Sequence, residues 1–307
     1  MLNVVRVHLF QLSLVVAAAC WGGATVISKR AVEEIEPLTL LPLELTVSVT
    51  VLAVAMAMRR ERVCWSPEMR RLSALGVLNP GLAYALSLAG LARVDASVSV
   101  LLWALEPVLI LAIAFVVLRD KVPMPVALCA GAALAGVMLV VFQPGHASPI
   151  GVTLTIAGVA ACAVYTVLSS RFLAEATTVS VVFVQQLTAL LFALALLVGS
   201  LVLSDPAPVV GVSATAWASA VAAGALYYGV AFWFYLAGLR GVPASLAGLF
   251  INLVPVFGIA ASYVGLGERL SPRQWVGAIV VIAAVAASAL YVGRRVSAED
   301  GAQRVEA

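Results

Sequence analysis

Ten apolar segments, each about as long as a membrane-spanning helix, alternate with short polar links in this chain of 307 residues. A helix needs about 20 mostly apolar residues to cross roughly 30 Å of hydrocarbon. Of the 18 basic and 15 acidic residues, only Glu44 and Glu106 lie inside the segments. We therefore predict ten transmembrane helices. They lie near residues 9–28, 38–58, 72–92, 96–118, 124–142, 150–170, 178–203, 213–238, 244–266 and 274–293.

The overall composition excludes the soluble classes. The chain is 63% hydrophobic and 11% charged, whereas soluble domains are about 45–50% apolar and about 25% charged. A soluble enzyme, a nucleic-acid binder and a disordered protein are therefore ruled out. A membrane barrel would need shorter segments that alternate in polarity, and these are absent from the sequence. We predict an all-α polytopic membrane protein.

The sequence lacks the motifs of metal, disulfide or nucleotide chemistry. Its four cysteines are scattered without C-x-x-C spacing, and its two histidines, His8 and His146, lie far apart. It has no G-x-x-x-x-G-K-[ST] phosphate-binding loop and no H-E-x-x-H motif. We therefore expect no cofactor, no metal, no ATP-driven step and no enzyme activity.

The distribution of lysine and arginine predicts the orientation in the membrane. If the N-terminus is cytoplasmic, 13 of these residues lie on the inner side and 5 on the outer side. The largest inner loop, 59–71, holds five of the 13. Because inner loops are enriched in positive charge, we expect a multi-pass protein of the plasma (inner) membrane with both termini in the cytoplasm.

The chain repeats itself at a shift of 148 residues. Pro107 maps onto Pro255 at this shift, Gly81 onto Gly229, and the pair Asp120-Lys121 onto Glu268-Arg269. Nearer the N-terminus, a shift of 142 aligns Ser28-Lys29 with Ser170-Arg171. We predict two five-helix repeats, 1–145 and 146–295, followed by a polar tail, 296–307. Because five is odd, the second repeat enters the membrane from the opposite side, and such inverted repeats are common in secondary transporters.

Short motifs recur in the two halves of the chain. They are Cys20–Gly23, Ser28–Lys29, Ala104–Val108 and Leu118–Lys121 in the first half, and Tyr165, Ser170–Arg171, Asn252–Val256 and Gly265–Leu270 in the second. These motifs resemble those of the EamA-type transporters of the drug/metabolite transporter superfamily. The resemblance implies ten helices in two inverted five-helix repeats around a central cavity. Its characterised members include exporters of amino acids and other metabolites. Many relatives carry an arginine where this chain has Leu43-Glu44-Leu45, so recognition of an anion is not expected there.

Glu106 is the first candidate site residue, because a charge in the middle of a membrane helix costs a few kcal/mol. Ser99 and Trp103 share its helix face and give a polar stripe that should point inward. The carboxylate would bind a solute or accept a proton. The alternative is a protonated side chain that bonds to a neighbouring helix and serves structure only.

Glu44 is the second intramembrane carboxylate and lies in the outer third of its span. It would couple protons or recognise a solute amine, and Lys29 at the end of the first span could pair with it. The alternative is an ion pair at the outer surface or a carboxylate that reaches the interface.

Pro107 and Pro255 are matched interruptions of their helices, since proline removes a backbone donor and frees a carbonyl. They would act as hinges or, alternatively, as static kinks.

Asn252 beside Pro255 should face the cavity or another helix. We expect Tyr84, Trp103 and Tyr228 to line the cavity as well. Phe232 and Tyr235 share the face of Tyr228, although Tyr235 is expected to be an interface anchor.

These features predict a secondary transporter of a small metabolite or drug-like compound, with export as the expected direction and proton coupling as one option. The alternative is a membrane protein without transport activity, either a structural or signalling partner or a lipid-modifying enzyme. The expected partners are the lipid bilayer and a small-molecule solute, with a second copy of the chain as a further candidate. Nucleic acid is not expected.

Overall fold

The computed structural model describes residues 2–118, 123–141, 148–169, 178–203, 211–239 and 250–306, and every regular element in these ranges is a helix. The all-helical prediction is therefore confirmed. Six helical stretches are long and apolar enough to cross a membrane, namely His8–Val32, Pro37–Arg59, Pro67–Leu91, Pro149–Ser169, Val179–Leu203 and Ala214–Tyr235. Four shorter apolar helices cover Ala96–Ile110, Met124–Val140, Val254–Gly265 and Pro272–Ser288. The ten-span arrangement stays a prediction.

The first half of the chain contains the elements α1 (Leu2–Val32), α2 (Pro37–Arg59), α3 (Pro67–Ala74), η1 (Leu75–Val77), η2 (Leu78–Leu82), α4 (Ala83–Leu91), α5 (Ala96–Trp103), α6 (Glu106–Leu118) and α7 (Met124–Val141). The second half contains α8 (Pro149–Ser169), α9 (Thr178–Leu203), α10 (Ala214–Ala223), η3 (Gly224–Val230), α11 (Ala231–Leu239), α13 (Val254–Gly265) and α14 (Pro272–Glu306). The repeat residues Asp120, Lys121, Ser170 and Arg171, and the start of the predicted span 244–266, lie outside the described residues.

Local sequence signals set where several helices begin. Proline is the first residue of α2, α3, α8 and α14. The N–H groups of the first helical turn have no partner within the helix, so a proline there costs no hydrogen bond. The Ser66 hydroxyl accepts a hydrogen bond from the Met69 amide at 3.1 Å and caps α3. Ser213 caps α10 in the same way, with the Ala216 amide at 3.1 Å. These signals fix the helix starts next to the polar links.

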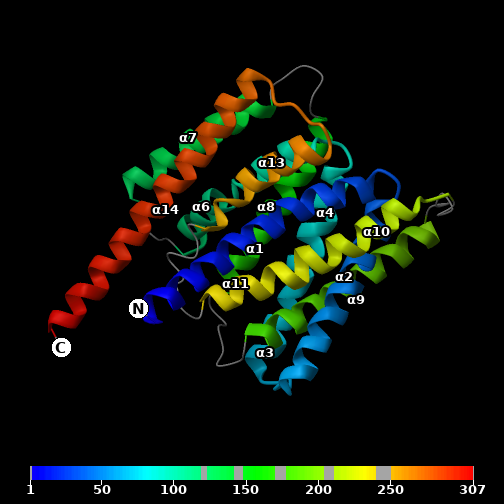
Figure 1. Ribbon diagram of the computed structural model, residues 1–307, viewed down its shortest axis with the longest axis horizontal. Coiled ribbons are helices and arrows are strands. Elements are labelled where there is room, and N and C mark those ends of the chain that lie inside the picture. Colours follow the sequence, from blue (N-terminus) through cyan, green and yellow to red (C-terminus); the bar gives the residue numbers. More distant parts are fainter. Residues whose placement is uncertain are drawn as a thin grey trace.

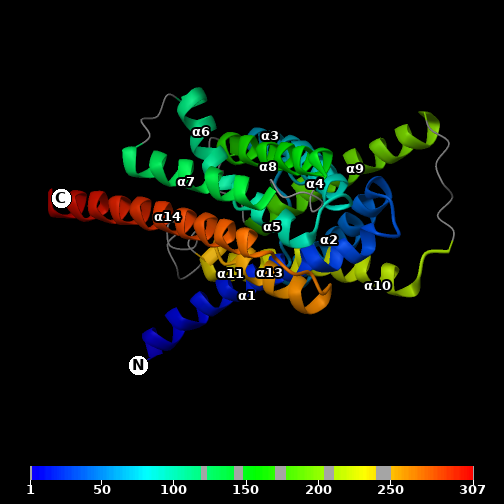
Figure 2. The ribbon, with the colours of Figure 1, turned by 90° about the horizontal axis from the view of Figure 1, so that it is seen from above.

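The helices form one elongated bundle with both termini at the same end, and α14 lies along α7 at one edge of it (Figure 1, Figure 2). Gly136 on α7 and Gly277 on α14 allow this close approach. A β-carbon on Gly136 would lie 2.8 Å from the Gly277 carbonyl oxygen, and one on Gly277 would lie 2.6 Å from the Gly136 oxygen. Small residues at helix contacts are typical of membrane bundles.

The helix interruptions recur at the repeat shift. The π-helical segment Leu78–Leu82 corresponds, 148 residues later, to the last five residues of the π-helical segment Gly224–Val230. The turn at 104–105 before α6 corresponds to the turn at 252–253 before α13. The two halves therefore share their irregularities as well as their motifs.

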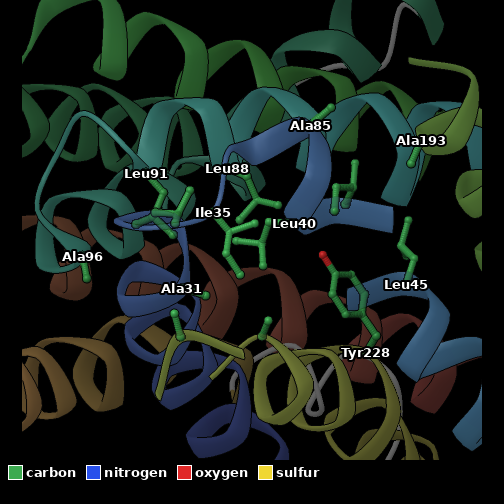
Figure 3. Packing of buried hydrophobic residues seen from close by; sticks show 14 of the residues in the cluster. Ala31, Ile35, Leu40, Leu45, Ala85, Leu88, Leu91, Ala96, Ala193 and Tyr228 are labelled. Atoms are coloured by element: carbon green, nitrogen blue, oxygen red, sulfur yellow. The ribbon is translucent and has the colours of Figure 1, made fainter. Parts of the chain in front are cut away.

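The largest hydrophobic core lies toward the end of the bundle opposite the termini. Ala31 and Ile35 from α1 and the loop after it pack there with Leu40 of α2, and Leu88 and Leu91 of α4 join them (Figure 3). All five side chains are at most 5% exposed. This packing joins the first repeat to α9 and α10 of the second, because Ala193 and Ala216 belong to the same cluster.

Candidate functional site

A cavity of about 450 Å³ lies in the middle of the bundle. This volume falls in the range of about 300–1,000 Å³ that is usual for small-molecule sites. Both halves of the chain line it, with α1, α4, α5 and α6 from the first and α8, α11, α13 and α14 from the second. The cavity is therefore a feature that neither half forms alone.

Twelve of the lining residues form six pairs related by the shift of 148. The pairs are Asn79/Tyr227, Tyr84/Phe232, Trp103/Ile251, Ala104/Asn252, Glu106/Val254 and Pro107/Pro255. The positions are symmetric, but the chemistry is not. The carboxylate of Glu106 has only Val254 as its counterpart, so the acidic group comes from one repeat.

Glu106 is positioned by the break between α5 and α6. The turn at 104–105 ends α5, and Glu106 begins α6 directly before Pro107. Its side chain lines the cavity, and the Cys162 thiol of α8 donates a hydrogen bond to Glu106 Oε1 at 3.3 Å. Among the described residues that line the cavity there is no lysine, arginine or histidine. Among the described residues, the carboxylate therefore brings the one charge to the cavity wall.

Aromatic side chains make up much of the cavity wall, in two groups. In the first, the ring centroid of Tyr84 lies 5.5 Å from that of Trp103 and 5.3 Å from that of Tyr227. In the second, the ring of Trp21 lies 5.3 Å from Phe232 and 5.5 Å from Tyr235. These separations are typical of stacked and edge-to-face aromatic pairs. Tyr235 lines the cavity, although the sequence predicted an interface anchor.

The structure corrects the predicted position of Tyr228. Tyr227, not Tyr228, lines the cavity with Phe232 and Tyr235, while Tyr228 is 1% exposed in the core. The reason is the π-helical segment Gly224–Val230. A π turn closes after five residues instead of four, so position 227 shares a face with 232. The predicted position of Tyr228 requires an unbroken α-helix, which this segment is not.

Asn79 and Asn252 lie on the cavity wall where helices are interrupted, Asn79 in a π-helical segment and Asn252 in a turn before a proline. Asn79 has an extended backbone (φ −144°, ψ 120°) inside the π-helical segment of the first half. Its Oδ1 atom is buried and has no hydrogen-bond partner among the described residues. Asn252 lies in the turn before α13, two residues before Val254 and three before Pro255. One cavity therefore brings together six of the predicted site residues, namely Tyr84, Trp103, Glu106, Pro107, Asn252 and Pro255.

Glu44 lies apart from the cavity, beside a small void with a mixed polar and apolar lining. It is 1% exposed, and the Ser28 hydroxyl donates a hydrogen bond to Glu44 Oε1 at 2.7 Å. The neighbouring void measures about 20 Å³, enough for about one water molecule, and is also lined by Ser87 and Ser99. Thr25, Tyr84, Trp103 and Tyr227 line both this void and the cavity, so they form the wall between them.

The structure places Lys29 away from Glu44. Lys29 Nζ donates to the Leu91 carbonyl oxygen at 2.9 Å, at the end of α4. Consecutive residues on a helix are turned by about 100°. Ser28 therefore points at Glu44, while Lys29 points at the neighbouring helix. The anticipated ion pair is replaced by a hydrogen bond from a neutral hydroxyl.

Charged side chains hold helix ends together at the end of the bundle opposite the termini, which we call the clasped end. Glu268 accepts hydrogen bonds from the Ala96 and Ser97 amides at 2.8 and 2.9 Å, at the start of α5. Arg30 donates to the Gly265 carbonyl oxygen at the end of α13. Anions at helix starts and cations at helix ends are the combinations that the helix dipole favours.

Glu34 forms a further contact of the clasped end. Its two carboxylate oxygens accept bonds from the Ser213 amide at 2.7 Å and the Ser213 hydroxyl at 2.8 Å, at the start of α10. The hydrogen bond from the Ser213 amide, and then that from its hydroxyl, lower the pKa of Glu34. The contacts of Arg30, Glu34 and Glu268 each join the first half of the chain to the second.

Comparison with known proteins adds the family. The model of the EamA-like transporter family matches residues 9–142 and, a second time, residues 149–290. The chain belongs to the EamA-like transporter family. The two matches together span nearly all of the chain, and each includes one member of every cavity pair described above. The EamA duplication therefore agrees with the shift of 148 that the cavity shows.

Two curated relatives are transporters by name. An uncharacterized transporter of Archaeoglobus fulgidus is 23% identical over 275 residues, which cover 88% of this chain and 94% of the relative. The uncharacterized transporter YyaM of Bacillus subtilis is 30% identical over 193 residues, or 60% of this chain and 61% of the relative. A solved crystal structure of a protein covers 94% of this chain and 98% of its own with a TM-score of 0.67 at 19% identity. It shares the fold of this EamA chain.

Two cavity residues, Tyr227 and Cys162, are not among the site residues predicted from the sequence. The signal for Tyr227 was present, because the shift of 148 maps Asn79 onto it and Tyr84 onto Phe232. No comparable signal marked Cys162. Its contact with Glu106 joins α8 to α6, and such a contact between distant helices follows from the packing rather than from any local pattern.

Proposed function

We propose that this chain is a secondary transporter that exports a small metabolite or drug-like compound by alternating access of two inverted five-helix repeats. The observation that carries the proposal is the cavity of about 450 Å³, lined at six pairs of matched positions in the two halves. Exchange of conformations between inverted repeats around a fixed midplane site is the general logic of such transporters.

The matched interruptions supply the hinges of this mechanism. Each of Pro107 and Pro255 follows a two-residue turn that separates it from the preceding helix segment. A turn at a proline permits one half-helix to tilt against the other at little cost. Glu106 and Asn252 lie beside these breaks, so a tilt of either segment would change the shape of the solute site.

The clasped end would be the outer gate. Both termini lie at the opposite end (Figure 1), and the positive-inside rule predicts them in the cytoplasm. The cavity would then open inward, and the contacts of Arg30, Glu34 and Glu268 between the halves would break when it opens outward. Glu44, near this gate and shielded from the cavity by an aromatic wall, would be the group that carries a coupled proton.

Reconstitution into proteoliposomes tests the proposal. Solutes from several chemical classes, including amino acids and cationic drugs, are loaded inside and exchanged against labelled solute outside. We expect exchange of at least one class, a loss of exchange in Glu106→Gln, and a strong reduction in the double variant Pro107→Ala/Pro255→Ala. The proposal fails if no solute is exchanged by well-folded protein, whereas an unchanged exchange in Glu106→Gln would only remove that residue from the solute site.

Cys64 offers a test of the orientation. It is an exposed free thiol in the loop between α2 and α3, which we predict to be cytoplasmic. In intact cells a membrane-impermeant maleimide should leave it unlabelled, and after permeabilisation it should label fully. Cys64→Ser controls for the remaining thiols. Labelling of intact cells would reverse the proposed orientation in the plasma membrane. The oligomeric state, including a homodimer, is open to mass measurement of the same sample.

A further inference from the structure

We infer that the solute is an organic cation with an apolar, preferably aromatic body. This inference rests on the proposed function, because it names the chemical class that the cavity would carry. It comes from the charges and rings of the cavity wall, which together distinguish a cation from a zwitterion or an anion.

The first argument is the charge of the cavity. Glu106 is the one acidic residue among the described lining residues, and no lysine, arginine or histidine is among them. The carboxylate receives a hydrogen bond from the neutral thiol of Cys162. A buried carboxylate needs a counter-charge or a proton. A bound cation supplies that counter-charge, whereas an anion would be repelled.

The second argument is the aromatic wall. Trp103 and Glu106 lie three residues apart across the break between α5 and α6, and the ring of Trp103 packs against Tyr84. Trp21, Phe232 and Tyr235 form the second group of rings. The faces of aromatic rings attract cations, and aromatic cages are the usual recognition device for quaternary ammonium groups. The same rings bury an apolar body.

The third argument concerns amino acids. A zwitterion brings a carboxylate as well as an ammonium group. The described wall offers that carboxylate no positive side chain, and the Tyr165 and Thr166 hydroxyls already donate to Gln185 Oε1 and the Cys162 carbonyl oxygen. The wall would therefore leave one end of a zwitterion without a charged partner, which disfavours it against a plain cation of the same size.

Three probes with similar aromatic bodies test the inference on the full chain in proteoliposomes, namely phenethyltrimethylammonium, phenylalanine and 3-phenylpropionate. We expect the cation to bind and to be exchanged, and the zwitterion and the anion to bind at least about tenfold more weakly. Glu106→Gln should weaken binding of the cation about tenfold without a similar effect on the other two. Trp103→Leu should weaken it about two- to fivefold.

Matched control variants separate a site effect from a general loss of fold. Glu33→Gln removes a carboxylate that is exposed in the loop after α1, and Trp217→Leu removes an exposed indole of α10. Both should bind the cation like the wild type. The inference is overturned if phenylalanine or 3-phenylpropionate is exchanged as well as the cation, or if Glu106→Gln binds the cation normally. In either case the proposed transport function would stand. If none of the three, nor any other solute, is exchanged, the proposed function fails too.

Discussion

Glu106 and Glu44 bring the same carboxylate into two different surroundings. Glu106 faces a cavity of about 450 Å³ with aromatic walls, whereas Glu44 faces a void of about 20 Å³ where serine and threonine hydroxyls lie among leucine and aromatic side chains. The first space is large enough for a small-molecule solute and the second for about one water molecule. The role of an intramembrane carboxylate therefore depends on the volume and chemistry of the space that it faces, and its presence in a span alone does not define that role.

The largest effect is expected for Glu106→Gln. The amide keeps the size of the side chain and removes the only acidic group of the described cavity wall. We expect solute exchange to fall at least about tenfold, while the thermal stability of the protein is retained. The same loss of exchange in Glu33→Gln would contradict the assignment, because that residue is exposed outside the cavity.

Substitutions of Glu44 should affect stability and the pH dependence of exchange, and they should leave solute binding unchanged. Glu44→Ala removes the acceptor of the Ser28 hydroxyl in a fully buried position, and a buried donor without a partner costs about 1–3 kcal/mol of unfolding free energy. Glu44→Gln keeps an acceptor oxygen and should recover most of that stability. Solute binding in Glu44→Gln should match the wild type, while the dependence of exchange on a pH gradient is lost. Weak solute binding in Glu44→Gln would remove the distinction between the two carboxylates.

A variant of the clasped end tests whether the contacts near Glu44 keep that end closed. Glu268→Ala removes two hydrogen bonds to the start of α5, each about 1.5–3 kcal/mol for a charged acceptor. A cysteine at Leu88, a buried residue that lines the void near Glu44, reports on opening of this end. In a Cys64→Ser background, we expect Glu268→Ala to raise the rate of maleimide labelling about tenfold or more.

The control for that variant is Arg269→Gln. Arg269 donates to the Tyr263 carbonyl oxygen at 2.9 Å, a contact within the second half of the chain. Its loss should leave the two halves joined and the labelling rate unchanged. Equal labelling in Glu268→Ala and Arg269→Gln would show that the contact of Glu268 with α5 does not hold this end together.

The smallest effect is expected from Glu34 and depends on pH. Its pKa is lowered from the ordinary value of about 4.5 by the amide and the hydroxyl of Ser213. A carboxylate with a lower pKa in the folded state stabilises the fold above its unfolded pKa, and the contribution is lost as the pH falls through the folded pKa. Glu34→Gln should therefore denature at a slightly lower temperature than the wild type at neutral pH, and the two proteins should converge only once the pH falls below the lowered pKa of Glu34. An equal difference in denaturation temperature between Glu34→Gln and the wild type at every pH would contradict this expectation.

The sequence predicted the fold class and much of the cavity, because both depend on patterns that a membrane enforces. Apolar length marks spans, and a polar stripe such as Ser99, Trp103 and Glu106 has to face inward. Tyr228 was predicted to line the cavity, but Tyr227 lies there instead because the backbone between 224 and 230 is π-helical. No residue in the segment signals this change of helix type. Lys29 and Glu268 bond to backbone groups of distant helices, and every residue offers such groups, so the sequence could not identify the partners.

Counterflow in proteoliposomes tests the central claim most directly. Vesicles that contain the full chain are loaded with unlabelled phenethyltrimethylammonium, and entry of the labelled cation is followed for wild type, Glu106→Gln and Glu33→Gln. We expect accumulation of label in the wild type and Glu33→Gln, and little or none in Glu106→Gln. Equal accumulation in all three proteins would contradict the central claim, because the solute would then pass without the carboxylate of the cavity.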